Sequence, residues 1–183
     1  SIDHPFDPIA LALGAEASFV ARSVDVEAKH LQDIIRRAHA HRGTSFVEIL
    51  QNCNVFNDGA FESVTDKETK ADHTLVLEHG KPLVFGRDRD RGIRLRNFRP
   101  EVVRLGDGLS EVDLLVHDER NPALAYLIAR LGPPHFPTPV GVFTAVERPC
   151  YEDGLAQQVA AAKATSAPDL AALFGRGETW VVR

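Results

Sequence analysis

The chain has 183 residues, a mass of 20.1 kDa and a formal net charge of −5, and it is long enough to bury a core of its own. Its apolar fraction of 44% and charged fraction of 26% are typical of a globular protein, and no run approaches the roughly 18 apolar residues of a membrane-spanning helix. The negative net charge argues against a general electrostatic grip on nucleic acid.

The two cysteines and the polar first residues indicate the cellular setting. Two cysteines without a secretion signal argue against a disulfide framework and predict a protein of the reducing cytoplasm. Because the sequence contains no Met, Ser1 is expected to be either a processed start or an internal cut.

The first quarter of the chain predicts alternating helices and strands. Asp7-Pro8 supplies an N-cap and a first-turn proline, Asp25 can cap a second helix, and Gly43 stands where helices commonly end. The last strand is apolar enough to be covered on both faces. In chain order, the expected elements are a helix at 9–15, a strand at 18–21, a helix from 26 to about 42 and a strand at 45–50.

This pattern resembles the second half of an α/β unit. A parallel sheet of only two strands would be marginal, so further strands must come from elsewhere. The sequence therefore predicts an incomplete sheet.

Beyond Asn57 the chain becomes more polar and its expected elements are shorter. The Asn121-Pro122 pair opens a helix, and Gly132 with two prolines stops it. In order, we expect an irregular connection at 58–72, a hairpin of strands 74–78 and 82–85, an edge strand at 93–96, strands at 102–105 and 112–117, a helix at 121–131, a strand at 140–146 and helices at 151–164 and 168–174.

The tripeptide Gly106-Asp107-Gly108 has two possible interpretations. Thiamine-diphosphate enzymes open their metal-binding segment with Gly-Asp-Gly, followed about thirty residues later by a ligand Asn. Here Asn121 is too close and lies at a helix cap, whereas Asp-Gly is a common hairpin turn. A simple turn is therefore favoured.

Two histidine groups are weak candidates for a metal or acid–base site. His117-Asp118-Glu119 precedes a helix, so solvation of a strand end and helix capping explain it more simply. His39 and His41 end a helix at spacing i and i+2, which points them to different faces and suits a shared metal poorly.

The arginine-rich stretch 87–99 has three open interpretations. It can protect a sheet edge, form a subunit contact or dock an acidic protein, and the first two are favoured because a charge run is usually a solvated face.

Cys53 is the strongest candidate for chemistry. It follows the strand-like run 44–50 within a polar loop that holds Asn52 and Asn54. One cysteine cannot hold a metal alone, and Cys150 lies far away in the sequence. Cys53 is therefore either an inert small hydrophobe or a ligand whose partners belong to chain that is not present here.

Four segments resemble the β subunit of the 2-oxoacid:ferredoxin oxidoreductases, and the 2-oxoglutarate type is the most similar branch. The most specific segment is 46–59, FVEILQNCNVFNDG. The segment 3–15, DHPFDPIALALGA, and the runs 117–122 and 137–149 resemble the same subunit. The resemblance covers nearly the whole chain.

The resemblance implies a fold and a set of cofactors. Residues 1–57 would end the thiamine-diphosphate-binding parallel-sheet α/β fold, and residues 58–183 would form a mixed α/β carboxyl-terminal extension. The family's β subunit carries thiamine diphosphate, Mg²⁺ and one [4Fe-4S] cluster. Cys53 matches the fourth cluster ligand and Asn57 matches a loop-stabilising position. The other cluster cysteines, the Gly-Asp-Gly motif and its Asn are expected in an amino-terminal half that is absent here.

The resemblance also implies an activity and partners. The enzyme would oxidatively decarboxylate a 2-oxoacid, transfer the acyl group to coenzyme A and reduce ferredoxin through the cluster. Its partners would be the α subunit and ferredoxin, with no nucleic acid and no membrane, and this chain alone would be inactive. The alternative is a non-catalytic interaction or scaffold domain with a buried Cys53, which predicts a monomer without an exposed apolar face.

Overall fold

The protein forms two units that are described separately. The computed structural model describes residues 2–3, 5–106, 108–165, 169–177, 180 and 182. The first unit comprises residues 1–148 and the second comprises residues 149–183. Every candidate residue except Cys150 belongs to the first unit.

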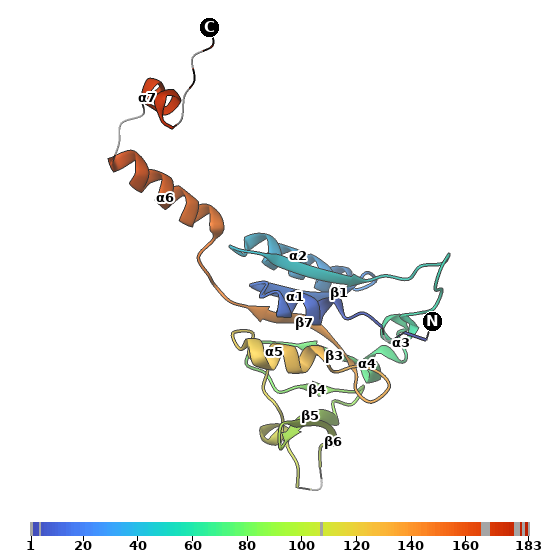
Figure 1. Ribbon diagram of the computed structural model, residues 1–183. Coiled ribbons are helices and arrows are strands. Elements are labelled where there is room, and N and C mark those ends of the chain that lie inside the picture. The colour runs from blue at the N-terminus through green and yellow to red at the C-terminus, as the bar shows by residue number, and fades with distance from the viewer. Residues whose placement is uncertain are drawn as a thin grey trace. The chain divides into compact units, whose positions relative to one another are not determined.

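A four-stranded mixed sheet organises the first unit, with strand order β2-β1-β7-β3 (Figure 1). The parallel pair β1 and β2 lies beside β7, which runs antiparallel to β1 and parallel to β3. The predicted α/β class with a parallel pair is confirmed. The strands are β1 Phe19–Val24, β2 Ser45–Leu50, β3 Thr74–Leu77 and β7 Thr138–Ala145.

The strands that complete the predicted two-stranded sheet come from later in the same chain. Both β3 and β7 follow residue 57, so strands from both sides of the expected boundary share one sheet. The boundary itself refers to the longer family subunit and stays a prediction.

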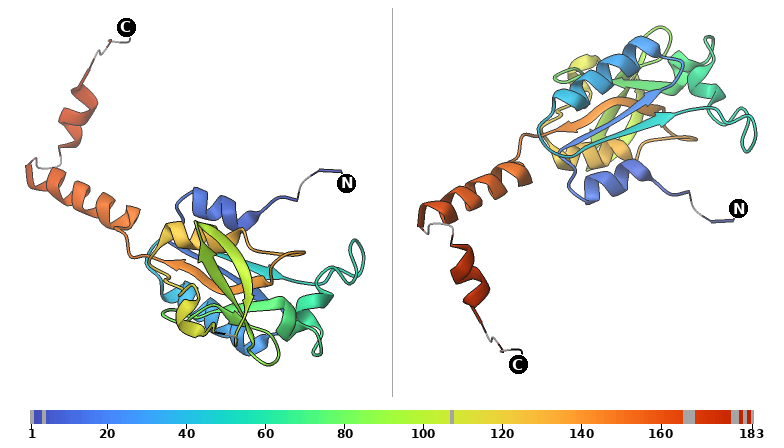
Figure 2. Two further views of the ribbon diagram at one scale, coloured as in Figure 1. Left: turned by 90° about the horizontal axis from the view of Figure 1, so that it is seen from below. Right: turned by 90° about the horizontal axis from the view of Figure 1, so that it is seen from above.

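Helices cover both faces of this sheet (Figure 2). Helices α1 (Pro8–Gly14) and α5 (Pro122–Ala129) pack on one face, where a cluster that includes Val20 and Phe143 is buried. Helix α2 (Ala28–Ala40) packs on the other face through Ile34. Burial on both faces gives β7 its almost continuous apolar run.

Two of the three predicted helix starts are confirmed. The Asp7 carboxylate accepts from the Ala10 amide at 3.0 Å, and the Asn121 amide oxygen accepts from the Leu124 amide at 3.1 Å. The second helix begins at Ala28 rather than Val26, because Asp25 accepts from the adjacent Val26 amide instead of capping the helix.

A second, antiparallel sheet has the order β4-β5-β6, with β4 Val84–Phe85, β5 Arg91–Arg96 and β6 Arg99–Arg104. The predicted hairpin of 74–78 with 82–85 is wrong. Its turn exists, since the Lys81 amide donates to the Glu78 carbonyl at 3.1 Å. However, β3 pairs with β7 and β4 pairs with β5, because each strand finds its hydrogen-bonding partner in a different sheet. The predicted edge strand 93–96 is central for the same reason.

The predicted strand 112–117 is also wrong. A 3₁₀ helix, η1 (Glu111–Asp113), begins the segment, because Ser110 and Asp113 form a reciprocal capping box. Before it, Gly106 and Leu109 exchange backbone hydrogen bonds as in a tight turn, while Asp107 lies outside the described residues.

Short helices occupy part of the expected irregular connection, namely α3 (Glu62–Thr65) and α4 (Lys70–His73). In the second unit α6 (Tyr151–Thr165) and α7 (Leu170–Gly175) confirm two predicted helices, although Pro168 lies outside the described residues. None of the described helices is long and apolar enough to cross a membrane.

The second unit exposes its apolar side chains. None of its described residues is buried. Exposed apolar residues there include Tyr151, Leu155, Val159, Leu173 and Phe174. The scaffold alternative, which expects a monomer without an exposed apolar face, receives no support from this unit.

His117 and Glu119 are buried, so the prediction that a solvated strand end explains the segment 117–119 is wrong. The His117 Nε2–H donates to the Val142 carbonyl at 2.8 Å, and His117 is fully buried. Glu119 is 7% exposed and accepts two hydrogen bonds from Arg37 of α2, at 3.1 and 2.6 Å. The segment lies against β7 and α2, which remove it from solvent. It therefore fastens α2 to the sheet.

Protonation of the His117 imidazole is unfavourable in the folded protein. Its Nε2–H already donates to a carbonyl, and its Nδ1 atom is buried without a partner. Burial lowers the pKa of His117 and outweighs the Val142 hydrogen bond and the charge of Glu119, which act in the opposite direction. His79 and Asp118 also face the imidazole, and their effects are smaller.

We expect this histidine to make the fold acid-sensitive. Between its ordinary pKa of 6.5 and its lowered pKa in the folded protein, His117 gains a proton only in the unfolded chain, so the free energy of unfolding falls by up to about 1.4 kcal/mol per pH unit. His117→Gln keeps a donor for Val142 but cannot titrate, and should flatten this slope in urea unfolding at pH 7.5 and 5.5. His39→Gln, at an exposed position, is the control and should keep it. Equal slopes for His117→Gln and the native chain would contradict the expectation.

Candidate functional site

The cysteine loop, residues 51–60, follows β2 at the carboxyl end of the parallel pair. Cys53 is exposed, which corrects the scaffold alternative's buried thiol. The expectation that β2 is covered on both faces is wrong as well. Only Leu50 is buried in this strand, because β2 lies at the edge of the sheet and pairs with β1 alone.

Asn52 holds the loop closed. Its side-chain NH₂ donates to Asn54 Oδ1 at 2.7 Å and to Asp58 Oδ1 at 2.8 Å, while its Oδ1 accepts from the Gly59 amide at 2.9 Å. The Asn57 amide donates to the Cys53 carbonyl at 3.0 Å. Sequence reasoning assigned loop stabilisation to Asn57 and missed Asn52. An Asn six residues before an Asp-Gly pair was the available signal.

The backbone of this loop favours the thiolate form of Cys53. The amide of Phe56, followed by those of Val55 and Asn57, donates toward the sulfur and lowers the pKa of the Cys53 thiol. The opposing effect of desolvation is smaller. Amides directed at sulfur and an exposed thiol of lowered pKa are features of metal-ligating cysteines. The loop therefore favours the thiolate, which is the form of cysteine that binds metals.

The loop contains one cysteine. Within the part of the chain that the structure describes, no three His, Cys, Asp or Glu side chains lie close enough to hold a metal ion. The other cysteine, Cys150, is partly exposed and belongs to the second unit. His41 Nε2 lies 2.8 Å from Ser18 Oγ, and His39 is exposed on α2.

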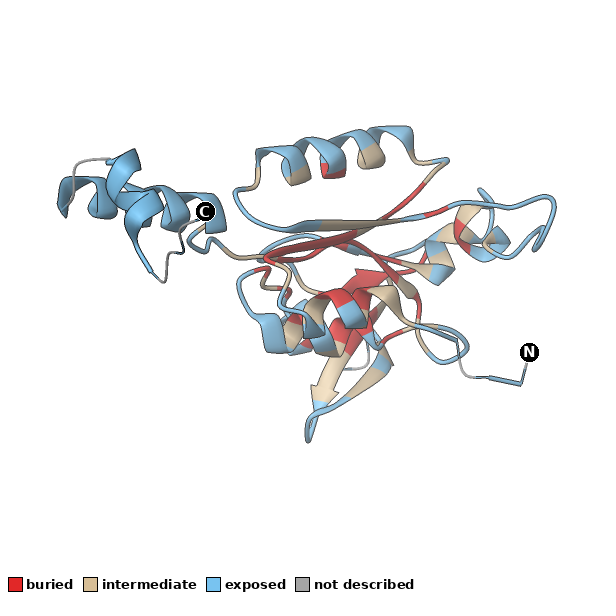
Figure 3. Ribbon diagram, turned by 45° about the horizontal axis from the view of Figure 1, so that its top comes forward, coloured by how far each residue is buried: buried red, intermediate tan, exposed pale blue. Residues whose placement is uncertain are grey.

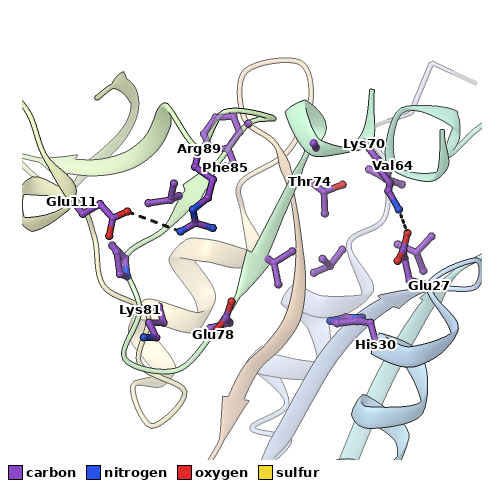
Figure 4. Close-up of a pocket in the computed structure, with 17 residues that line it drawn as sticks. Glu27, His30, Val64, Lys70, Thr74, Glu78, Lys81, Phe85, Arg89 and Glu111 are labelled. Atoms are coloured by element: carbon purple, nitrogen blue, oxygen red, sulfur yellow. Dashed lines mark hydrogen bonds and ion pairs between the residues drawn. The ribbon is translucent and has the colours of Figure 1, made fainter. Parts of the chain in front are cut away.

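A cavity of about 590 Å³ lies beside the end of β1, in the range of small-ligand sites (Figure 4). Helices α2, α3 and α4 and strands β3 and β4 contribute to its walls. Apolar side chains line part of it: Val24, Val64, Val76, Val84, Phe85 and Val140.

Charged pairs stand at two sides of this cavity. Glu27 pairs with Lys70, and Arg89 Nη2 lies 4.0 Å from Glu111 Oε1 (Figure 4). Glu78 and Lys81 add one charge of each sign. Because both signs alternate around an apolar wall, the cavity does not select for a strongly charged ligand.

Two further polar side chains, His30 and Thr74, line the cavity. His30 Nδ1 lies 2.8 Å from Ser23 Oγ, and burial lowers the pKa of this imidazole despite the nearby Glu27 and Asp33 carboxylates. The Thr74 hydroxyl is buried without a hydrogen-bond partner. Sequence reasoning missed the cavity, because its residues come from elements far apart in the chain.

The cysteine loop can be tested through the reactivity of its thiol. Asn52→Ala should raise the pKa of Cys53 toward its ordinary value, because the amides lose their alignment on the sulfur. The pH dependence of iodoacetamide alkylation, measured in a Cys150→Ser background, reports this pKa. Asn57→Ala is the matched control, since it keeps its backbone amide and should leave the profile in place. Identical profiles for Asn52→Ala and its parent would refute the role of Asn52.

No protein-family model matches the chain, but individual proteins do. The chain is 39% identical, over its whole length, to the 2-oxoglutarate oxidoreductase subunit KorB of Mycobacterium tuberculosis, and covers 50% of that protein. Over 67 residues it is 37% identical to the 2-oxoacid:ferredoxin oxidoreductase subunit beta of Saccharolobus solfataricus, 22% of which is covered.

A solved structure shares the fold. It is a 2-oxoglutarate:ferredoxin oxidoreductase from Magnetococcus marinus with 2-oxoglutarate, coenzyme A and succinyl-CoA bound. The match covers 98% of this chain and 47% of the solved chain, with a TM-score of 0.63 and a sequence identity of 16%. The chain thus spans about half the length of the KorB subunit and of this solved chain. The resemblance seen in the sequence is confirmed: the chain is similar to subunits of 2-oxoglutarate and 2-oxoacid:ferredoxin oxidoreductases.

Proposed function

We propose that the chain is part of the β subunit of a 2-oxoglutarate-type oxidoreductase. The assembled enzyme would oxidatively decarboxylate a 2-oxoacid, pass the acyl group to coenzyme A and deliver electrons to ferredoxin. The observation that carries this proposal is the sequence identity of 39%, over the whole of this chain, to a 2-oxoglutarate oxidoreductase subunit. The α subunit and ferredoxin would be its protein partners, in the cytoplasm.

Cys53 would be a ligand of the enzyme's [4Fe-4S] cluster. Its exposed thiol and the amides of residues 55–57 support this role. Four thiolates are the rule for such clusters, so the others would come from elsewhere in the assembly. When bound, the cluster supplies one-electron transfer, and thiamine diphosphate with Mg²⁺ supplies the decarboxylation chemistry.

The chain's own contribution would be placement and electrostatics. The Asn52 side chain holds the loop, and the amides of Val55, Phe56 and Asn57 place partial positive charge at the sulfur. Hydrogen bonds to a ligating sulfur tune the reduction potential. Cys53 thus acts as a ligand in an electron relay and not as a nucleophile.

Thiamine diphosphate and Mg²⁺ do not fit the described residues. No set of three possible metal-ligating side chains occurs among them, and Gly106 and Gly108 flank a tight turn. These groups would bind mainly to other parts of the assembly. We propose that residues 1–57 end the thiamine-binding fold, that 58–183 extend it, and that the chain alone is inactive.

The first experiment is viologen reduction by the anaerobically assembled enzyme. The complex, with the rest of the β subunit and the α subunit, receives 2-oxoglutarate and coenzyme A. Cys53→Ala should abolish reduction and reduce the iron–sulfur absorbance, because the cluster loses a ligand. Cys150→Ala, the matched control, should retain both signals.

Three outcomes would contradict parts of this proposal. Activity that survives Cys53→Ala removes Cys53 from the relay but leaves the enzyme class intact. Activity with another 2-oxoacid, and none with 2-oxoglutarate, changes the proposed substrate but not the proposed reaction. A complete native assembly that fails to reduce viologen with every 2-oxoacid supplied refutes the function. The chain would then return to the scaffold interpretation.

A further inference from the structure

The cavity beside the end of β1 is shaped by contacts within this chain. Glu27 of α2 pairs with Lys70 of α4, and Arg89, between β4 and β5, lies beside Glu111 of η1 (Figure 4). Each pair joins two parts of the cavity wall that are distant in the sequence. The volume of about 590 Å³ and these walls are therefore features of the described fold itself.

Much of the wall is apolar. Val24 and Val140 belong to β1 and β7, two strands that are buried along most of their length (Figure 3). Val64, Val84 and Phe85 line the cavity as well, and all three are buried. A molecule with an apolar body removes its own surface from water when it lies against such a wall, so an apolar body is favoured here.

The charged side chains of the wall balance one another. Three are acidic and three are basic, and four of the six form the two ion pairs described above. An ionic ligand would compete with these pairs or be buried without a counterion, and both are unfavourable. The wall therefore favours an uncharged ligand. The six side chains are Glu27, Glu78, Glu111, Lys70, Lys81 and Arg89.

His30 supplies a polar atom that the fold leaves without a partner. Its imidazole extends from α2 into the cavity (Figure 4), and its Nδ1 lies 2.8 Å from Oγ of the fully buried Ser23. No described residue forms a hydrogen bond with Nε2. Burial lowers the pKa of His30, which keeps the ring neutral near pH 7. Ser23 thus holds the ring in place and leaves Nε2 for a ligand.

A hydroxyl group suits this nitrogen in either tautomer of the ring. If Ser23 donates to Nδ1, Nε2 carries the hydrogen and is a donor; if Nδ1 donates to Ser23, Nε2 is an acceptor. An alcohol can both donate and accept. The hydroxyl of Thr74, another wall residue, is buried without a hydrogen-bond partner, which is uncommon in folded proteins.

We propose that this cavity binds a small uncharged molecule with an apolar body and a hydroxyl group directed at His30 Nε2. The apolar wall selects the body, the balanced charges disfavour ions, and the imidazole selects the hydroxyl. An apolar cavity of this size with a few convergent polar groups is typical of small-molecule sites. The inference is independent of the proposed reaction, because binding is measured without substrate.

The test uses three probes that share a trifluoromethylphenyl body. Para-trifluoromethylbenzyl alcohol carries the hydroxyl, para-ethylbenzotrifluoride replaces that hydroxyl with a methyl group, and para-trifluoromethylbenzoate is an anion. Fluorine NMR titrations of the chain, and separately of the complete assembly, give the Kd of each probe. We expect the alcohol and the ethyl compound to bind and the benzoate not to bind. Benzoate affinity equal to that of the alcohol would refute the ligand class.

Two substitutions locate the site. His30→Leu should weaken the alcohol about five- to tenfold and spare the ethyl compound, because only the alcohol loses a hydrogen bond. His39→Leu, at an exposed position of the same helix, is the matched control and should change neither Kd. Val76→Trp, at a wall position that is 50% exposed, should abolish binding of both probes. Val102→Trp, at a position on β6 that is 40% exposed and outside the cavity, should not.

Comparison of the chain with the complete assembly separates a ligand from a protein segment as the occupant. The chain spans about half the length of the KorB subunit, so a segment of a longer subunit is the rival occupant. A cavity filled by such a segment would bind the alcohol in the isolated chain and lose that binding in the assembly, which would overturn the proposal. Equal affinity in both preparations, with the response to His30→Leu retained, supports it.

Two further results would overturn the proposal. One is the absence of alcohol binding in both preparations, and the other is an alcohol Kd that His30→Leu and Val76→Trp leave unchanged. Failure of the proposed function is recognised separately, because an assembly that binds the alcohol as expected but reduces viologen with no 2-oxoacid refutes the enzymatic reaction alone.

Discussion

The pairing of β7 with β1 and β3 is the constraint on which the first unit depends. β7 is buried on both faces and joins an early strand, β1, to β3. Its fit against β3 is tight at Gly141, which has φ of 121° and where a Cβ atom would lie 2.8 Å from the Leu77 carbonyl oxygen. Both helical layers pack on β7 and its neighbours, and β7 also supplies the carbonyl that holds His117. Without this strand, β1 and β2 would be a marginal pair.

The position of the cysteine loop depends indirectly on this pairing of strands. β1 anchors β2 along its whole length, and β2 delivers Cys53 to the carboxyl edge of the sheet, where α/β folds commonly place their ligands. Within the loop, local hydrogen bonds fix the conformation. Asn52 closes it, and the backbone amides that follow Cys53 lower the pKa of the thiol, so the electrostatic preference for a thiolate is present in the chain itself.

Within the first unit, some exposed loops carry large apolar side chains. Val55 and Phe56 beside Cys53 are 81% and 91% exposed, and Phe98 shares this property at the hairpin tip. Elsewhere, as at Asp7, Asn121 and Ser110, local sequence and local structure agree. Such a distribution is typical of a fold whose exposed loops meet other molecules, because local conflicts persist where an external contact compensates them.

The sequence by itself determined the elements whose causes are local. The Asp7 and Asn121 caps, the limits of β2 and the prominence of Cys53 could all be inferred from neighbouring residues. The partners of the strands could not be inferred, because interstrand hydrogen bonds join residues distant in the chain and the turn at 78–81 is compatible with more than one pairing. For the same reason, the burial of His117 and the pairing of Arg37 with Glu119 could not be inferred from the sequence. Only the tertiary structure decided which polar groups lose contact with water, since that loss is imposed by elements packing from elsewhere in the chain.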